Sequence, residues 1–96
     1  MRIETESRII KWGRDYILAP SEGRLLKSLV NRTVKLTLVS DTGVYSMVAK
    51  VSENPQYGVI VYLPKRMAPT WEKLHEKQLK AIIEVGGGDG DGVRRE

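Results

Sequence analysis

Short runs of alternating apolar and polar residues, separated by turn-forming residues, make up most of this chain. The segment Val34-Lys35-Leu36-Thr37-Leu38-Val39 has a period of two, as expected for a strand with one buried face. Similar patterns or short apolar runs predict strands at 8–12, 16–19, 44–51, 57–63 and 79–85. Turns are predicted at Gly13-Arg14-Asp15, Asp41-Thr42-Gly43 and Glu53-Asn54-Pro55-Gln56. The pattern therefore predicts a mainly β fold.

Two short helices are predicted to interrupt the strands. Ser21 can cap a helix over 22–30, whose apolar face holds Leu25, Leu26 and Leu29. Thr70 can cap a helix over 71–76, whose apolar face holds Trp71 and Leu74. Both segments are too short to be stable alone, so we expect them to pack against the strands.

The order strand, turn, strand, proline, short helix, strand occurs twice. Pro20 aligns with Pro64 at an offset of 44 residues, and Val34 aligns with Leu79 at an offset of 45. This alignment predicts one inserted residue in the second helical region and two halves at about 6–41 and 44–85. Because each half alone would bury too little apolar surface, we expect the halves to share one core.

The two ends of the chain differ from its body. Residues 1–5 are polar and are expected to fray. The segment 86–96 contains five of the nine glycines and little to bury, so it is predicted to be a disordered tail. We therefore expect a single domain over residues 1–85.

A short motif in the first half resembles a known family. The stretch Ile10-Lys11-Trp12-Gly13-Arg14-Asp15-Tyr16-Ile17-Leu18-Ala19-Pro20 is similar to the opening of AbrB/MazE-like (SpoVT-AbrB) swapped-hairpin proteins. Those proteins read roughly Lys-Trp-Gly-Asn-Ser, an apolar strand, then Ile-Pro-Lys and a short helix. In the second half, Tyr62-Leu63-Pro64-Lys65 resembles the family's corner between strand and helix.

The resemblance has consequences for architecture. Family members usually supply one such unit per chain and dimerise into an interleaved barrel. The resemblance therefore implies a pseudo-symmetric swapped-hairpin β-barrel built from two ββαβ-like repeats, present as a monomeric pseudo-dimer or as a homodimer. The second half departs from the motif, having Asn54-Pro55-Gln56-Tyr57-Gly58 where Lys-Trp-Gly would stand. This difference argues against equal DNA reading by the two halves.

The charge of the chain favours a polyanionic partner. The formal net charge is +4, and residues 1–85 alone carry 14 Lys and Arg against 9 Asp and Glu, a net charge of +5. There is no apolar run of the roughly 18 residues that a membrane span requires. The first six residues contain no apolar segment of the kind found in secretory signals, so we expect a cytoplasmic protein without membrane contact.

Four cations are the candidate nucleic-acid-binding residues. The resemblance implies contact with double-stranded DNA at the turn and at the corner, which here hold Lys11, Arg14, Lys65 and Arg66. A two-stranded ribbon with basic side chains can follow phosphates or enter the major groove. An arginine at a turn tip can donate two hydrogen bonds to guanine or to a phosphate.

Other chemistry has little support in the sequence. His75 is the single histidine and cysteine is absent, so neither a metal site nor a nucleophile with its base is expected. No glycine-rich phosphate loop precedes a helix. We therefore expect no enzyme activity and no cofactor. Because the chain lacks phenylalanine, Trp12 and Trp71 are expected in the core, together with the four tyrosines.

Two functions remain open on the sequence alone. The first is a DNA-binding transcriptional regulator, an antitoxin-type protein or a chromatin-associated protein. The second is a small accessory subunit that docks on a larger protein of a nucleic-acid machine. An exposed apolar patch beside Met67 and Trp71 would favour the second function.

Overall fold

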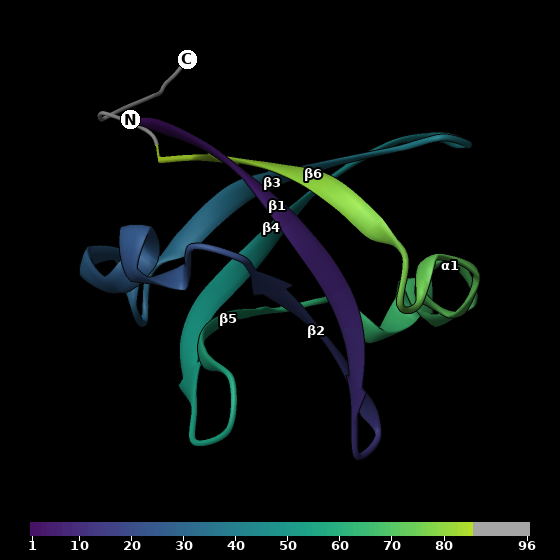
Figure 1. Ribbon diagram of the computed structural model, residues 1–96, viewed down its shortest axis with the longest axis horizontal. Helices are drawn as coiled ribbons and strands as arrows, with labels where there is room; N and C mark the ends of the chain where they lie inside the picture. The colour runs from purple at the N-terminus through teal and green to yellow at the C-terminus, as the bar shows by residue number, and fades with distance from the viewer. Residues whose placement is uncertain (86–96) are drawn as a thin grey trace.

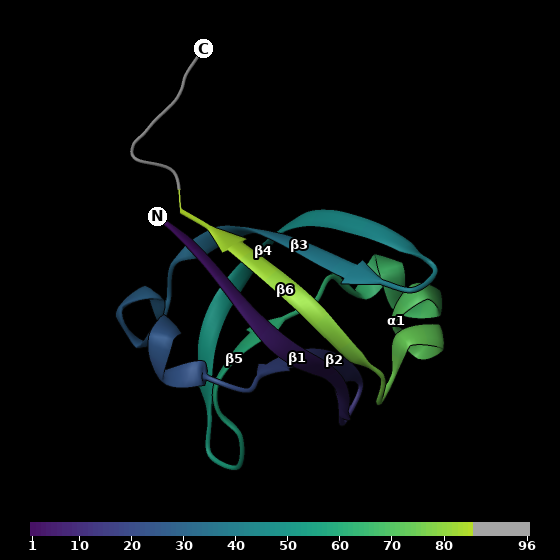
Figure 2. The same cartoon turned by 45° about the horizontal axis from the view of Figure 1, so that its top comes forward.

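Six antiparallel strands form a closed barrel in the computed structural model, which describes residues 1–85 (Figures 1 and 2). Along the chain the elements are β1 (Arg2–Trp12), β2 (Asp15–Pro20), the 3-10 helix η1 (Gly23–Leu29), β3 (Thr33–Ser40), β4 (Gly43–Asn54), β5 (Gly58–Tyr62), the 3-10 helix η2 (Lys65–Met67), α1 (Ala68–Leu74) and β6 (Gln78–Glu84). The strands follow the order β1-β2-β5-β4-β3-β6, and β6 pairs with β1 to close the ring. The prediction of a mainly β barrel with short helices is confirmed.

The core fills the barrel from one side of each strand. On β3, for example, Val34, Leu36 and Leu38 are buried between exposed or half-buried neighbours. Helical segments contribute from two sides, with η1 and α1 at opposite edges of the view in Figure 1. Trp71 of α1 is fully buried, and its indole Nε1 donates to the Pro64 carbonyl at 2.8 Å. Truncating a buried tryptophan to alanine typically lowers the free energy of unfolding by about 3–5 kcal/mol, so Trp71 is a principal anchor of the C-terminal half.

The two halves of the chain are related by an internal two-fold symmetry. Exchanging β1 with β4, β2 with β5 and β3 with β6 reproduces the same ring of neighbours. Each half therefore contributes a hairpin and a third strand, and the halves join through four ladders, β2–β5, β3–β6, β3–β4 and β1–β6. The β3 strand pairs with the hairpin of the second half, and β6 pairs with the hairpin of the first half.

Special backbone conformations recur at equivalent places in the two halves. Asn31 and Glu76, 45 residues apart, have positive φ angles of 72° and 66°. The Asn31 amide donates to the Val51 carbonyl at 2.8 Å, and the Glu76 amide donates to the Ile9 carbonyl at 3.1 Å. The same connection between helix and strand is thus built twice, although the residues that build it differ.

The register of the strands shows that the predicted alignment of Pro20 with Pro64 is wrong by one residue. β2 contains the buried run 16–18 and β5 contains the buried run 59–61, so these strands correspond at an offset of 43. The counterpart of Pro20 is therefore Leu63 and not Pro64, and two residues rather than one are inserted in the second helical region. The physical reason is that Pro20 still lies in the sheet, opposite Ser7, whereas Pro64 lies beyond β5 and precedes η2.

The N-terminus is also more ordered than expected. β1 begins at Arg2, which pairs with Glu84, so the prediction of frayed residues 1–5 is wrong. Thr5 and Ser7 are 7% and 2% exposed and occupy inward positions that the neighbouring strands fill with apolar side chains. Polar residues at these positions conceal the alternation that would have identified the strand.

The helical segments differ from their predicted bounds and caps. Neither Ser21 nor Thr70 caps a helix, because η1 begins after Glu22 and α1 begins at Ala68, with Thr70 inside it. Leu26 and Leu29 are buried as expected, whereas Leu25 is 45% exposed. A 3-10 helix has three residues per turn rather than 3.6, so the face predicted from α-helical spacing does not hold in η1.

The two ends of the described chain meet at a place equivalent to the β3–β4 turn. The Val85 amide donates to the Met1 carbonyl at 3.0 Å, and Figure 2 shows the N-terminus beside the end of β6. The predicted tail, 86–96, lies outside the described residues. Within residues 1–85, no helix is long and apolar enough to cross a membrane.

A circular permutant tests the internal symmetry. A chain running from Thr42 to Gly88 and then from Met1 to Asp41 moves the ends to the β3–β4 turn and uses 86–88 as the linker. We expect cooperative thermal unfolding with a Tm within about 10 °C of the parent, because the new break interrupts a turn and no ladder. A control permutant opened between Ala81 and Ile82 breaks β6 and should lose the cooperative transition. Failure of both permutants to fold would contradict the equivalence of the two connections.

Candidate nucleic-acid interface

The four candidate cations come from two segments that are distant in the sequence. Lys11 is the penultimate residue of β1, and Arg14 follows Gly13 in the β1–β2 turn. Gly13 has a φ of +62°, which a two-residue turn between strands favours. Lys65 and Arg66 begin η2, directly after Pro64. All four side chains belong to exposed residues.

Barrel closure brings the two segments together. The β2–β5 ladder places Tyr62 opposite Ile17, and the next amide, that of Leu63, donates to the Tyr16 carbonyl at 3.0 Å. The chain leaving β5 therefore passes the start of β2. There Lys65 Nζ lies 3.2 Å from Asp15 Oδ1, and its side chain is 74% exposed. The structure thus places the predicted turn and the predicted corner at one end of the barrel.

Lys11 lies against an aromatic ring and forms no ion pair with any residue of 1–85. In the β1–β2 ladder it stands opposite Tyr16, and its Nζ lies 5.8 Å from the centroid of the Tyr16 ring. The Tyr16 hydroxyl donates to Glu72 Oε2 of α1 at 2.8 Å. This hydrogen bond, together with burial and the negative charge of Glu72, raises the pKa of Tyr16 above its usual value of 10.0. The first hairpin is consequently connected to α1.

The four cations differ in whether a carboxylate of the protein already pairs with them. Among the described residues, Arg14 and Arg66 take part in no ion pair. Lys65 is held by Asp15, and an exposed pair of this kind contributes about 0–1 kcal/mol. An incoming phosphate can therefore replace the Asp15 carboxylate at small cost.

Cations gather at the turn of only one of the two symmetric hairpins in the described part of the chain. The ladders make Glu53 the counterpart of Lys11 and Gly58 the counterpart of Asp15. The β4–β5 turn holds Pro55, Gln56 and Tyr57, with no cation. Anionic residues gather elsewhere, around a surface hollow lined by Glu4, Thr5, Glu6, Glu22 and Lys80. The backbone symmetry is thus not repeated in the surface chemistry.

The aromatic residues divide into a buried and an exposed group. Core positions are confirmed for Trp71 and for Tyr16, which is 8% exposed. The prediction is wrong for Trp12, which is only half-buried, and for Tyr57 and Tyr62, which are 38% and 37% exposed. The rings of Trp12 and Tyr57 meet edge to face across the two hairpins, with centroids 5.8 Å apart. No periodicity within one strand could have identified this contact between two hairpins.

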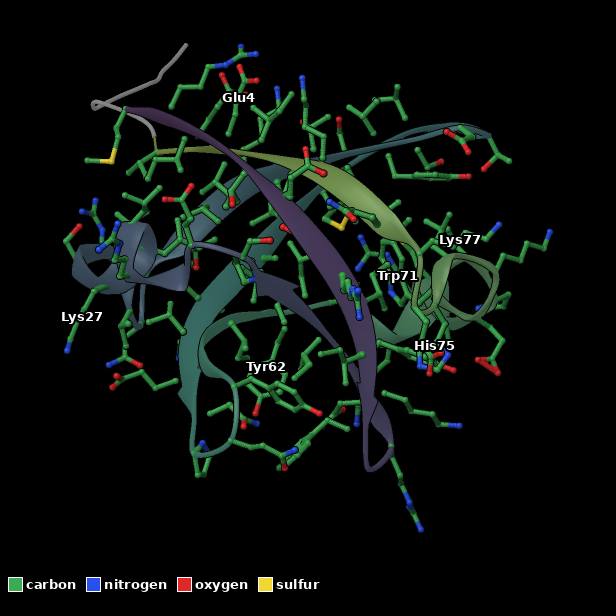
Figure 3. All side chains as sticks on the ribbon, in the orientation of Figure 1. Glu4, Lys27, Tyr62, Trp71, His75 and Lys77 are labelled. Atoms are coloured by element: carbon green, nitrogen blue, oxygen red, sulfur yellow. The ribbon has the colours of Figure 1, made fainter. Side chains whose placement is uncertain are left out.

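Other sequence expectations can be placed in the structure. His75 lies near α1 (Figure 3), with its Nε2 3.6 Å from Glu76 Oε2. Over residues 1–85, no group of three or more potential metal ligands is found. The exposed apolar patch suggested beside Met67 and Trp71 is not present, because Trp71 is fully buried and Met67 is half-buried against the core.

Comparison of this chain with protein-family models, with curated proteins and with solved structures finds no match.

The contact between Tyr16 and Glu72 makes a prediction about alkaline pH. Because the folded pKa of Tyr16 is raised, the neutral phenol stabilises the folded state fully below pH 10 and loses this contribution as pH rises through the folded pKa. Tyr16→Phe should therefore lower the free energy of unfolding at pH 8, and the difference from the parent should shrink above pH 10. Urea unfolding at several pH values measures this difference. A difference that stays constant up to pH 12 would contradict the role of the hydrogen bond.

Proposed function

We propose that this protein binds double-stranded DNA through the β1–β2 turn and the start of η2, as a transcriptional regulator, an antitoxin-type protein or a chromatin-associated protein. The observation that carries the proposal is the contact between Lys65 and Asp15, which joins the two basic segments into one surface. Four exposed cations at one end of a small barrel provide a surface that can neutralise several phosphates.

The shape of the β1–β2 hairpin suits contact with the edge of a DNA groove. The β1–β2 hairpin projects from the barrel (Figure 1), and Arg14 lies at its turn. A projecting two-stranded ribbon is narrow enough to approach the major groove, where an arginine fork recognises guanine or a phosphate. Lys65 lies beside the start of β2, and Arg66 follows it in η2, so both can contact the DNA backbone next to the hairpin. The asymmetry between the hairpins favours one DNA contact per chain.

The internal two-fold symmetry supports a further part of the proposal, namely that two AbrB/MazE-like units are fused in this chain. Both halves have the order hairpin, helical segment, strand, and each half completes its sheet with the third strand of the other. Such an exchange makes the two halves interdependent. We therefore expect the folded unit to be a monomer. Separately, we expect the protein to be cytoplasmic.

A different surface favours the second candidate, an accessory subunit that docks on a larger protein. Val44 and Val48 of β4 are 64% and 65% exposed. They point outward beside the half-buried Val39 of β3, which pairs with Val44. Exposed apolar residues on a sheet face are typical of protein contacts. This surface lies on strands other than the first hairpin, so the two candidate functions can be tested independently.

The salt dependence of duplex binding tests the leading proposal. Four phosphate contacts should give a slope of log K against log salt of about −3.6, at about −0.9 per contact. Arg14→Ala should reduce the slope to about −2.7 without affecting folding, because a turn side chain without an ion pair among the described residues contributes little to stability. Fluorescence anisotropy with a labelled duplex provides the measurement.

Lys27→Ala serves as the matched control for this titration. Lys27 is an exposed cation on η1, on the opposite side of the view from α1 (Figure 3). Its removal lowers the net charge by the same amount and should leave the slope almost unchanged. Equal effects of the two substitutions would indicate non-specific attraction, and a duplex Kd weaker than about 100 μM at moderate salt would end the DNA proposal.

Asp15→Asn tests the competition between the carboxylate and the phosphate. If DNA displaces the Asp15 carboxylate from Lys65, removing its charge should strengthen duplex binding about two- to fivefold, the range expected from an exposed ion pair. The same anisotropy titration at low salt measures the change. Unchanged or weaker binding would place Lys65 outside the contact.

A further inference from the structure

Two fully buried residues lie outside the barrel core. Ile17 of β2 and Ile60 of β5 are 0% exposed, yet neither belongs to the cluster that fills the barrel. Successive side chains of a strand point to opposite faces, and their neighbours Leu18 and Val61 point inward. Ile17 and Ile60 must therefore face outward and be covered by something other than the barrel interior.

The two hairpins supply this cover. Ile10 stands opposite Ile17 in the β1–β2 ladder, so it shares the outward face. Beyond Ile10, the β1–β2 and β4–β5 hairpins extend to the same side of the molecule (Figure 1). There the Trp12 ring meets the Tyr57 ring at an interplanar angle of 82°. A second, smaller apolar cluster thus lies between the hairpins, and aromatic rings form its outer surface.

These rings remain accessible to a ligand. Tyr62 shares the outward face of Ile60 on β5 and lies between the two hairpins (Figure 3). It is 37% exposed, Tyr57 is 38% exposed, and Trp12 is half-buried. Three partly exposed aromatic residues therefore face the space between the hairpins.

The charges around these rings are mainly positive. Lys50 of β4 is the cross-strand partner of Tyr62 and points outward with it. Arg14 of the β1–β2 turn and Lys65, which is paired with Asp15 opposite Trp12, flank the other side of this aromatic surface. Asp15, the anion opposite Trp12 in the ladder, is already paired with Lys65. Rings bordered by cations match a ligand that has flat aromatic groups on an anionic backbone.

We propose that the surface formed by Trp12, Tyr57 and Tyr62 binds a single-stranded stretch of nucleic acid. Unpaired bases would stack on the exposed rings, while Arg14, Lys50 and Lys65 contact the phosphates. The bases of an intact duplex are stacked on one another and cannot use these rings. The inference rests on the proposed function, because it shares two of the four basic residues, Arg14 and Lys65, with the duplex contact.

Tryptophan fluorescence provides a direct test. Trp71 is fully buried, so quenching by a ligand at the hairpins reports on Trp12. We expect a dodecamer of deoxythymidine to quench the fluorescence, and Trp12→Phe to remove the quenching. An abasic dodecamer has the same phosphates without bases and should bind at least about fivefold more weakly, since stacking contributes roughly 5- to 150-fold per base.

Tyr62→Leu separates base stacking from charge attraction. Leucine keeps apolar cover over the second cluster and removes the flat ring, so the variant should fold and bind the dodecamer at least about fivefold more weakly. Its duplex affinity should not change. Leu25→Ala is the matched control, because Leu25 is an exposed apolar residue on η1 and should affect neither ligand. Thermal unfolding of each variant verifies that it is folded.

The outcomes distinguish this inference from the proposed function. Equal binding of the abasic and base-containing dodecamers, or duplex binding with no dodecamer binding, would overturn the inference and leave the duplex proposal standing. Failure of every nucleic acid to bind would overturn both. Base-dependent quenching that disappears in Trp12→Phe and weakens in Tyr62→Leu would support the single-stranded site.

Discussion

The short ladder between β2 and β5 is the contact on which the rest of this structure depends. It consists of two residue pairs, Ile17 with Tyr62 and Leu18 with Val61, yet it joins the two hairpins and helps close the ring. A closed ring leaves no unpaired strand edge, which a separate half could not achieve. In these two pairs Leu18 and Val61 point inward, whereas Ile17 and Tyr62 point outward. One ladder therefore contributes to both apolar clusters.

The same ladder positions the candidate interface. Because β5 ends beside the start of β2, the corner that holds Lys65 reaches Asp15, and Tyr62 lies between the hairpins. By the internal symmetry, the corner at η1 approaches β5 in the second half, where a Cβ added to Gly23 would lie 3.1 Å from the Val59 carbonyl oxygen. The backbone thus offers two equivalent sites, and only the first carries a cluster of basic side chains at its turn and corner.

Much of the architecture was predictable because strand periodicity and turn chemistry are local. The alternation of 34–39 and the Asp41-Thr42-Gly43 turn lead directly to β3, β4 and their hairpin. The prediction failed where local rules were overridden. Thr5 and Ser7 are buried although they are polar, and η1 winds as a 3-10 helix. The alignment of Pro20 with Pro64 was misleading because one proline lies in a strand and the other follows one.

The sequence by itself determined the mainly β class, the duplicated order of elements and the four basic residues, since each depends on neighbours within a few positions. The tertiary structure alone decided that Lys65 meets Asp15, that Lys11 lies on Tyr16, and that Trp12 contacts Tyr57. These contacts join residues from separate elements through the strand order of the closed ring. Strand order depends on which edges pair, and that is set by the packing of the whole barrel rather than by any single segment.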